Sequence, residues 1–290
     1  MKIMFYTSSL GKGGAERVIS ILSNNLSVKY DIDIVVNTLK NCSYKINDNI
    51  KLIELDKKRT KLHFIRNIKR IFNTKKIIQK EKPDIIISFL PIPSYRILIL
   101  KKKFSDIPVI VADRNDPAHE YKSLINKITM TILYARANAF VFQTEQQKQY
   151  FNEKIQNNST IIYNPIKDEF LRSSKTEKEN TIITIGRLVK QKNHKILINA
   201  FSNISKNYPE YTLKIFGEGP FKRKLQKQIN KLNMSKKIKL CGITNSVKEE
   251  LEKAKIFILS SNYEGMPNAL IEAMAVGVPC ICTNCPCGGP

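Results

Sequence analysis

Short apolar runs alternate along the chain with stretches in which apolar residues recur every three or four positions. The opening run, residues 2–9, precedes such a stretch at 14–27, whose apolar residues fall on one face of a helix. Continuous apolar runs separated by helices are typical of parallel strands buried on both faces. The first half of the chain therefore predicts an α/β domain, with further strands at residues 31–36, 83–90, 108–113 and 138–144.

The pattern breaks at Asn164-Pro165 and resumes after a polar connector. We therefore predict two domains, residues 1–165 and 166–290. Each is expected to be a Rossmann-like, doubly wound sheet in which the loops at the carboxyl ends of the strands gather in a crevice. With two such domains, those edges are expected to face each other across a cleft. The strands of the second domain are predicted at residues 181–186, 212–217, 238–242 and 255–260.

The stretch YEGMPNALIEAMAVGVP places two glutamates around the start of a helix. Pro267 suits the first helical turn, and Gly277 is expected to end the helix. Glu264 then lies in the crevice loop, and Glu272 lies about a turn and a half inside the helix. Both carboxylates can accept hydrogen bonds from the hydroxyls of one ligand. The spacing alone agrees equally well with an acidic first turn and one solvated glutamate.

Two loops at predicted strand ends are suited to bind an anion. Gly265 and Met266 present backbone N–H groups at the positive end of a helix. Arg187 and Lys192 follow the strand predicted at 181–186, where two cations can hold a diphosphate and stabilise it as a leaving group. Because 49 of the 290 residues are Lys or Arg, the pair alone agrees with a solvated loop as well.

Glycine-rich turns connect a strand to a helix in both predicted domains. Gly13 and Gly14 lie in GKGGAER, which matches neither the Walker pattern nor G-x-G-x-x-G. Gly217 has the corresponding place in FGEGP. Such turns let backbone amides approach a phosphate, and a plain tight turn is the alternative.

The balance of 49 Lys+Arg against 25 Asp+Glu gives a net charge of +24 and favours anionic partners. The basic segment 57–82 carries Leu62, Ile65, Ile68 and Phe72 at helical spacing. It predicts an amphipathic helix that rests on anionic lipid or packs its apolar face into the core. No signature of a nucleic-acid-binding module accompanies the charge. No apolar run is long enough to span a membrane and no signal peptide is visible, so a cytoplasmic location is expected.

Two segments carry residue types that bind metals, but neither predicts a metal site. Asp31 and Asp33 alternate with apolar residues in a strand and are interpreted as solvated edge residues. Four cysteines lie within residues 280–287, with no second cluster to complete a ligand spacing. Cys280 and Cys282 are predicted to pack as small apolar side chains in a short buried strand.

Taken together and in this order, six segments resemble the retaining nucleotide-sugar glycosyltransferases of family 4, which have the GT-B fold. The resemblance covers nearly the whole chain, and the last segment, with its Glu-x7-Glu spacing, is the most specific. It is strongest to the branch that acts on polyprenyl-diphosphate-linked sugars or surface polysaccharides. The segments are GGAERV (13–18), DRNDP (113–117), IYNPI (162–166), GRLVKQK (186–192), FGEGP (216–220) and the stretch 263–290.

This resemblance implies that the second domain binds the donor. Arg187 and Lys192 then hold the donor diphosphate without a metal or another cofactor, Glu264 contacts the donor sugar and Glu272 contacts the ribose. Retention would follow from front-face attack, in which the leaving diphosphate helps to deprotonate the acceptor. Further donor contacts are implied for Gly13, Gly14, Gly217, Gly265, Met266, Pro267 and Asn268.

The first domain is implied to be the acceptor side, through Arg114 and Asn115. Many family members carry a histidine there, so this chain departs from the pattern. The family's second domain usually continues for several more elements, one of which crosses back to the first domain. We therefore expect the second domain to be incomplete, with an uncovered apolar sheet edge and reduced stability.

The sequence thus predicts an enzyme that moves a sugar from a UDP-linked donor to a lipid-linked or polysaccharide acceptor at the inner face of the cytoplasmic membrane. Two alternatives stay open at this point. One is a non-catalytic basic protein that binds nucleic acid or an anionic membrane. The other is an enzyme like the nucleotide-sugar 2-epimerases, which share the fold.

Overall fold

The computed structural model describes residues 1–11, 13–40, 42–56, 62–171 and 176–287. The chain divides into two compact units, Met1–Pro165 (unit 1) and Ile166–Pro290 (unit 2). Each unit is built around a sheet of its own in which the described strands pair in parallel. The prediction of two parallel α/β sheets is confirmed.

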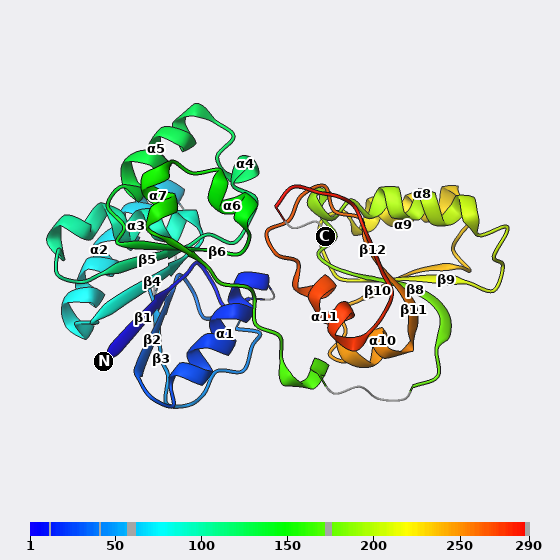
Figure 1. The fold of residues 1–290 in the computed structure, drawn as a ribbon, viewed down its shortest axis with the longest axis horizontal. Coiled ribbons are helices and arrows are strands. Elements are labelled where there is room, and N and C mark those ends of the chain that lie inside the picture. Colours follow the sequence, from blue (N-terminus) through cyan, green and yellow to red (C-terminus); the bar gives the residue numbers. More distant parts are fainter. Residues whose placement is uncertain (12, 41, 57–61, 172–175, 288–290) are drawn as a thin grey trace. The chain divides into compact units, whose positions relative to one another are not determined.

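The described residues of unit 1 form a seven-stranded sheet in the order β3-β2-β1-β4-β5-β6-β7 (Figure 1). The order reverses direction at β1, as in a doubly wound fold. The strands are β1 (Lys2–Tyr6), β2 (Asp31–Val36), β3 (Lys51–Glu54), β4 (Ile85–Phe89), β5 (Val109–Ala112), β6 (Ala139–Phe142) and β7 (Ser159–Ile161).

Helices cover both faces of this sheet, so alternate residues of β1 enter different cores. Ile3 and Phe5 pack with α1 (Gly14–Leu26), whereas Met4 and Tyr6 pack on the face of α2, α3 and α5. The helices on that second face are α2 (His63–Glu81), α3 (Pro91–Leu100) and α5 (Leu124–Tyr134). Unit 1 also contains the short helices α4 (Pro117–Glu120), α6 (Glu145–Gln149) and α7 (Glu153–Asn157) and the 3-10 turn η1 (Lys101–Lys103).

The apolar residues of the basic segment do not pack into the core. Ile65, Ile68 and Phe72 of α2 are exposed, and Leu62 lies exposed just before the helix. The alternative in which this apolar face packs into the core is therefore wrong. The core is contacted by a different side of α2, which includes Ile78. The part of the predicted segment at residues 57–61 lies outside the described residues.

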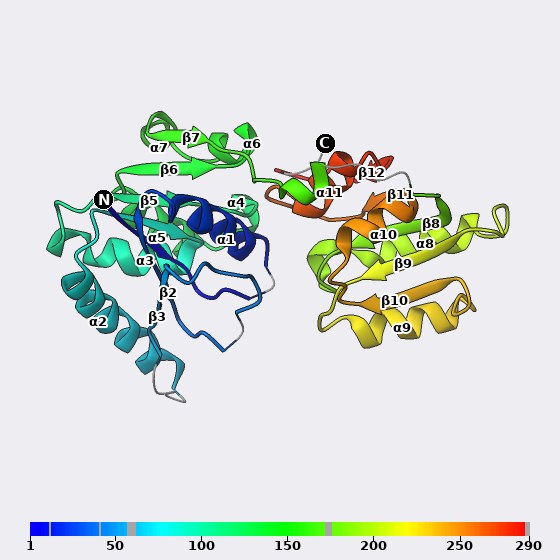
Figure 2. The same cartoon turned by 90° about the horizontal axis from the view of Figure 1, so that it is seen from below.

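Unit 2 has a five-stranded sheet over its described residues, in the order β10-β9-β8-β11-β12 (Figure 2). Ile182 packs with α8 and α9 on one face, and the next residue, Ile183, packs with α10 and α11 on the other. The elements are η2 (Asp168–Leu171), β8 (Glu179–Ile185), η3 (Lys190–Lys192), α8 (His194–Ile204), β9 (Thr212–Phe216), α9 (Lys222–Lys231), β10 (Ile238–Gly242), α10 (Val247–Lys253), β11 (Ala254–Leu259), α11 (Asn268–Val276) and β12 (Cys280–Cys282).

Two interpretations of single strands need correction. Asp33 lies in β2, which β1 and β3 flank on both sides, so it is not a solvated edge residue. Its carboxylate is buried and forms an ion pair with Lys2 Nζ at 3.0 Å. The strand predicted around Cys280 and Cys282 is present as β12, but Ile281 between them is 57% exposed. The two cysteines pack on the α11 side, while Ile281 points to the other face of the outermost described strand.

Candidate functional site

The loops after β8 and β11 lie side by side at the carboxyl ends of these neighbouring strands in unit 2. Hydrogen bonds that span about seventy residues of sequence join them. The Asn262 N–H donates to Gln191 O at 2.8 Å, and its side-chain amide donates to Lys190 O at 2.8 Å. Ser260 Oγ donates to Lys192 O at 3.0 Å. The sheet therefore holds the two segments that carry the predicted site residues at one place.

Lys192 and Glu264 form an ion pair where these loops meet. Lys192 Nζ lies 2.6 Å from Glu264 Oε1, and the two side chains are only 14% and 7% exposed. Ser261 Oγ donates a hydrogen bond to the same oxygen. The other oxygen, Oε2, accepts a long contact of 3.5 Å from Gln191 Nε2. Glu264 is thus fixed through Oε1, while Oε2 keeps capacity to accept a stronger hydrogen bond.

Arg187 lies on the same loop as Lys192 but is exposed. In the part of the chain that the structure describes, its guanidinium makes no hydrogen bond or ion pair. Beside it the backbones at the ends of β8 and β9 approach each other closely. A Cβ on Gly217, whose φ is +142°, would lie only 1.9 Å from Gly186 O. Gly217 therefore belongs to the same loop cluster as Arg187 and Lys192.

The segment from Gly265 to Asn268 leads from Glu264 into α11. Pro267 is the N-cap in an extended conformation, one residue before the helical turn in which it was predicted. Gly277 ends the helix with a φ of +79°, as predicted. Glu272 is 3% exposed and no acid occupies the first turn, so the alternative of an acidic first turn with a solvated glutamate is wrong.

The glycines predicted near a phosphate in unit 1 lie at the start of α1. Gly13 is the N-cap, and its N–H donates to Gly11 O at 2.9 Å. The Glu16 carboxylate lies beside Gly13 and accepts a hydrogen bond from Ser9 Oγ at 2.9 Å. Gly14 is the exposed first residue of the helix. An acid therefore occupies the helix start in the structure.

Arg114 and Asn115 follow β5 in unit 1 and are held by their own loop. The Arg114 guanidinium lies 4.9 Å from the centre of the Phe89 ring, and its Nη1 donates to Asn164 Oδ1 at 2.9 Å. Burial lowers the pKa of Arg114 to about 10, so it stays charged at neutral pH. Asn115 Nδ2 donates to Glu120 Oε1 at 2.5 Å. Both residues are thus ordered at a strand end.

Asp113, just before these two, is buried at the end of a tyrosine network. It accepts hydrogen bonds from the hydroxyls of Tyr121 at 2.5 Å and Tyr134 at 3.3 Å. Burial raises the pKa of its carboxyl to about 6, although the Tyr121 hydrogen bond opposes the rise. This network fixes the base of the Arg114 loop and was not anticipated.

Two family models match the chain. The model described as Glycosyltransferase Family 4 matches residues 12–170, more than half of the chain, and the model described as Glycosyl transferases group 1 matches residues 166–290. The chain belongs to glycosyltransferase family 4. The resemblance of the motifs to this family is therefore confirmed, and with it the prediction of an enzyme that transfers glycosyl groups.

Individual relatives agree with this assignment. A Campylobacter jejuni enzyme named GalNAc-α-(1→4)-GalNAc-α-(1→3)-diNAcBac-PP-undecaprenol α-1,4-N-acetyl-D-galactosaminyltransferase is 30% identical over 280 residues, which cover 94% of this chain and 77% of the relative. A lipopolysaccharide 1,6-galactosyltransferase of Salmonella typhimurium is 25% identical over 312 residues, 99% of this chain and 81% of the relative. The crystal structure of Anabaena Alr3699/HepE with UDP and glucose has a TM-score of 0.78 at 16% identity, covering 99% of this chain and 82% of the other. The fold is thus the GT-B fold of these enzymes.

Sequence reasoning missed His194 of this family 4 glycosyltransferase. It is the first residue of α8, next to the Lys192 loop, and is 3% exposed. Burial lowers the pKa of its imidazole to about 4, while the backbone of Arg187 and Gly186 partly opposes this. The ring is therefore neutral at pH 7. The signal was its spacing from Leu197 and Phe201, which places it on the buried face of the helix.

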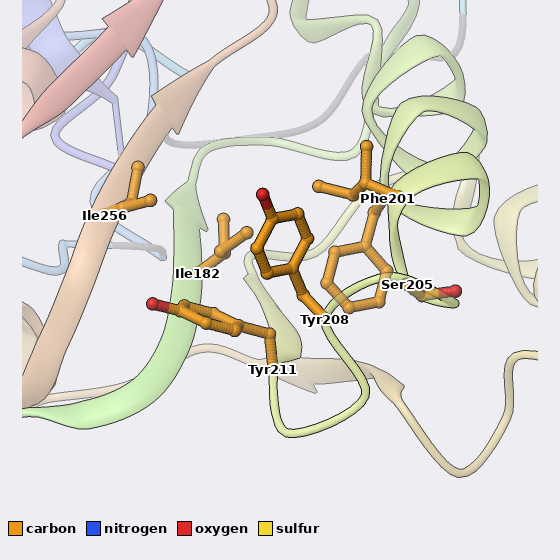
Figure 3. A pocket seen from close by; sticks show the side chains of 7 residues that line it. Ile182, Phe201, Ser205, Tyr208, Tyr211 and Ile256 are labelled. Carbon is orange, nitrogen blue, oxygen red and sulfur yellow. The ribbon is translucent and has the colours of Figure 1, made fainter.

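An apolar pocket of the glycosyltransferase lies away from these loops. Tyr208 and Tyr211 lie between the end of α8 and the start of β9, so the pocket is at the amino ends of the strands (Figure 3). It holds no charged side chain and does not include a predicted site residue. It is lined by Ile182, Phe201, Ile204, Ser205, Tyr208, Tyr211 and Ile256.

Two kinds of feature are absent from the described residues. Among them, no three His, Cys, Asp or Glu side chains converge in a way that suits a metal ion. No helix within them combines the length and the apolar character needed to cross a bilayer. The carboxylate at the centre of the loop cluster is instead neutralised by a lysine of the chain itself.

Proposed function

We propose that this family 4 glycosyltransferase moves a sugar from a UDP-linked donor to a polyprenyl-diphosphate-linked or polysaccharide acceptor, with retention of the anomeric configuration. The observation that carries the proposal is the buried Lys192–Glu264 pair, on the same loop cluster as an Arg187 guanidinium that has no hydrogen-bond or ion-pair partner among the described residues. Relatives named for undecaprenol-linked and lipopolysaccharide acceptors support the acceptor class. UDP and glucose in the Anabaena structure support the donor class.

The two cations are proposed to hold the donor diphosphate. Lys192 has three N–H donors, of which one points to Glu264, and Arg187 offers a planar fork that suits paired phosphate oxygens. When the bond from the anomeric carbon to the diphosphate oxygen breaks, negative charge grows on UDP. Both cations then stabilise the leaving group more strongly than the bound substrate, which lowers the barrier.

Glu264 is proposed to position the sugar and not to attack it. Its Oε1 is held by Lys192 and Ser261, which leaves Oε2 to accept a hydrogen bond from a sugar hydroxyl. The acceptor oxygen bonds to the anomeric carbon on the face that the diphosphate leaves, and its proton passes to the departing UDP. Glu272 in α11 is proposed to contact the ribose, with Gly217 and the segment from Gly265 to Asn268 lining the phosphates.

The two units are proposed to divide the substrates between them. Unit 2 carries the donor residues, and unit 1 contacts the acceptor through Arg114 and Asn115, with Gly13 and Gly14 near the donor. Because polyprenyl-diphosphate substrates are anchored in a bilayer, the enzyme is proposed to work in the cytoplasm at the inner face of the membrane. No metal or other cofactor is included, since Arg187 and Lys192 supply the positive charge.

Thermal shift against nucleotides tests the donor class, and turnover tests the residues. UDP is expected to raise the melting temperature, whereas ADP and GDP at the same concentration are not.

Arg187→Ala and Glu264→Gln are expected to lower kcat/KM by about 100-fold or more, in the range for removing one transition-state contact. Lys195→Ala, which removes an exposed cation one residue beyond His194, is the matched control. Unchanged turnover in both site variants would refute the assignment.

A further inference from the structure

The three residues of η3 are held to the loop after β11 through their backbone carbonyls. Asn262 donates its backbone N–H to Gln191 O and its side-chain amide to Lys190 O, both at 2.8 Å. Ser260 Oγ donates to Lys192 O at 3.0 Å. The backbone of Gln191 is therefore fixed independently of its side chain.

The Gln191 carboxamide lies beside the Glu264 carboxylate. Its Nε2 donates to Tyr263 O at 3.1 Å and lies 3.5 Å from Glu264 Oε2. Because both neighbours can only accept hydrogen bonds, the NH2 group faces them and Oε1 faces away. Among the described residues nothing donates to Gln191 Oε1, and the side chain is only half-buried, so a ligand can reach this atom.

Two acceptor oxygens thus lie next to each other at the loop cluster, Gln191 Oε1 and Glu264 Oε2. A phosphate group has only acceptor oxygens and gains nothing from such a pair. A hydroxyl group donates to such an oxygen, and a sugar presents hydroxyls on neighbouring ring carbons. The pair therefore suits two adjacent hydroxyls of the sugar, while the cations Arg187 and Lys192 suit the diphosphate.

We propose that Gln191 is a specificity-determining residue for the donor sugar. Its carboxamide contacts the hydroxyl on the ring carbon next to the one whose hydroxyl Glu264 holds. A sugar that lacks this hydroxyl leaves Gln191 Oε1 without a partner, and a site built to bind a hydroxyl discriminates against such a sugar. The proposal rests on the proposed function, because it adds a contact to the same donor site.

A purely structural role for Gln191 makes a different prediction. If the carboxamide only braces the loop through Tyr263 O, its loss affects the nucleotide and every donor sugar alike. If it contacts one sugar hydroxyl, its loss affects only donors that carry that hydroxyl. Affinity for UDP is the readout that separates the two roles, since UDP has no donor sugar.

Isothermal titration calorimetry with UDP and UDP-sugars tests the contact without an acceptor. The tightest-binding of UDP-glucose, UDP-galactose, UDP-N-acetylglucosamine and UDP-N-acetylgalactosamine serves as the parent donor. Gln191→Leu is expected to weaken binding of the parent donor about tenfold, as for the loss of one hydrogen bond, and to leave the Kd of UDP unchanged. Gln226→Leu, the same change at an exposed position of α9, is the matched control and should bind like the wild type.

Single-deoxy forms of the parent donor identify the hydroxyl concerned. One of them should bind equally well to the wild type and to Gln191→Leu, because the contact is already missing from the ligand. Glu264→Gln should single out the deoxy form at a neighbouring ring carbon. In that variant the amide oxygen is drawn to Lys192, so an NH2 group replaces the acceptor Oε2. The wild type alone should bind the deoxy form that Gln191 selects about tenfold more weakly than the parent donor.

Several results would overturn the proposal. Gln191→Leu could bind the parent donor like the wild type, or lose the same factor for UDP and for every sugar. The two variants could also select ring carbons that are not neighbours. Wild-type binding of UDP and of all four UDP-sugars with equal Kd would overturn it while leaving the donor nucleotide in place. A wild type that binds none of these compounds would instead refute the donor class, and this contact with it.

Discussion

The site in unit 2 depends on a charge pair that is largely removed from water. Lys192 and Glu264 are each less than 15% exposed, and only a few polar groups surround them. A buried ion pair is weak support for net stability, but each partner is needed to neutralise the other. The pair therefore couples the β8 loop to the β11 loop energetically as well as geometrically.

A double-mutant cycle measures this coupling. Lys192→Met alone leaves the Glu264 carboxylate buried without its cation, and we expect it to destabilise unit 2 by about 3 kcal/mol. Adding Glu264→Gln removes the stranded charge and should recover part of that loss, giving a coupling energy of about 1–3 kcal/mol. Urea unfolding of the wild type, both single variants and the double variant provides the four values. Additive losses would show that the contact carries no coupling.

The buried His194 is expected to make the folding stability of unit 2 sensitive to acid. Its folded-state pKa is lowered by burial from 6.5 to about 4, so the unfolded chain binds a proton more readily between these values. The stabilising contribution is present above pH 6.5 and is lost as the pH falls toward 4, by about 2 kcal/mol between pH 7 and pH 5. Hydrogen exchange of α8 peptides at these two pH values follows the loss. In His194→Gln the stability of α8 should fall less between pH 7 and pH 5. An equal fall in the variant and the wild type would show that His194 is not the group responsible.

At the scale of the elements, the ends of two strands pack so closely at Gly217 that a residue with a side chain does not fit there. Alanine there would combine a φ of +142° with a Cβ only 1.9 Å from Gly186 O. We expect Gly217→Ala to cost about 2–4 kcal/mol and to displace the Arg187 loop, with loss of turnover. Gly277→Ala is the control, because a φ of +79° strains alanine but nothing lies within 4 Å of its Cβ. That variant should cost about 1–2 kcal/mol and stay active. Equal melting temperatures for the two would contradict the packing argument.

Strands with long apolar runs were predictable from the sequence, whereas the two short outer strands of unit 1 were not. The strands β4 (IIISF) and β11 (AKIFIL) each contain a single polar residue, so they stand out. In contrast, β3 is KLIE and β7 is the three residues STI, and each depends on one neighbouring strand to form. The same limit applies to the site. Glu264 was predicted in a loop at a strand end because it follows an apolar run, but its bonds to Gln191 and Ser261 depend on tertiary contacts that no local spacing reveals.

Each unit buries two apolar clusters of its own, one on each face of its sheet. Cores that do not share residues allow the units to unfold separately. The residues proposed to bind the donor through its diphosphate, sugar and ribose, Arg187, Lys192, Glu264 and Glu272, all belong to unit 2, while Gly13 and Gly14 belong to unit 1. The whole molecule thus offers a way to ask which unit a nucleotide stabilises.

Calorimetry of the full chain is expected to show two unfolding transitions, of which UDP raises only one. A ligand that binds the folded state alone stabilises it by about 2.7 kcal/mol at a concentration of one hundred times Kd. Hydrogen exchange assigns the shifted transition, because UDP should protect peptides from residues 186–192 and 260–272 most strongly, with smaller protection around residues 10–17, where Gly13 and Gly14 are proposed to lie near the donor. The Arg187→Ala variant, with the same two transitions, should lose the shift. Absence of protection around residues 10–17 would remove Gly13 and Gly14 from the donor site, and a shift of the unit 1 transition alone would refute donor binding by unit 2.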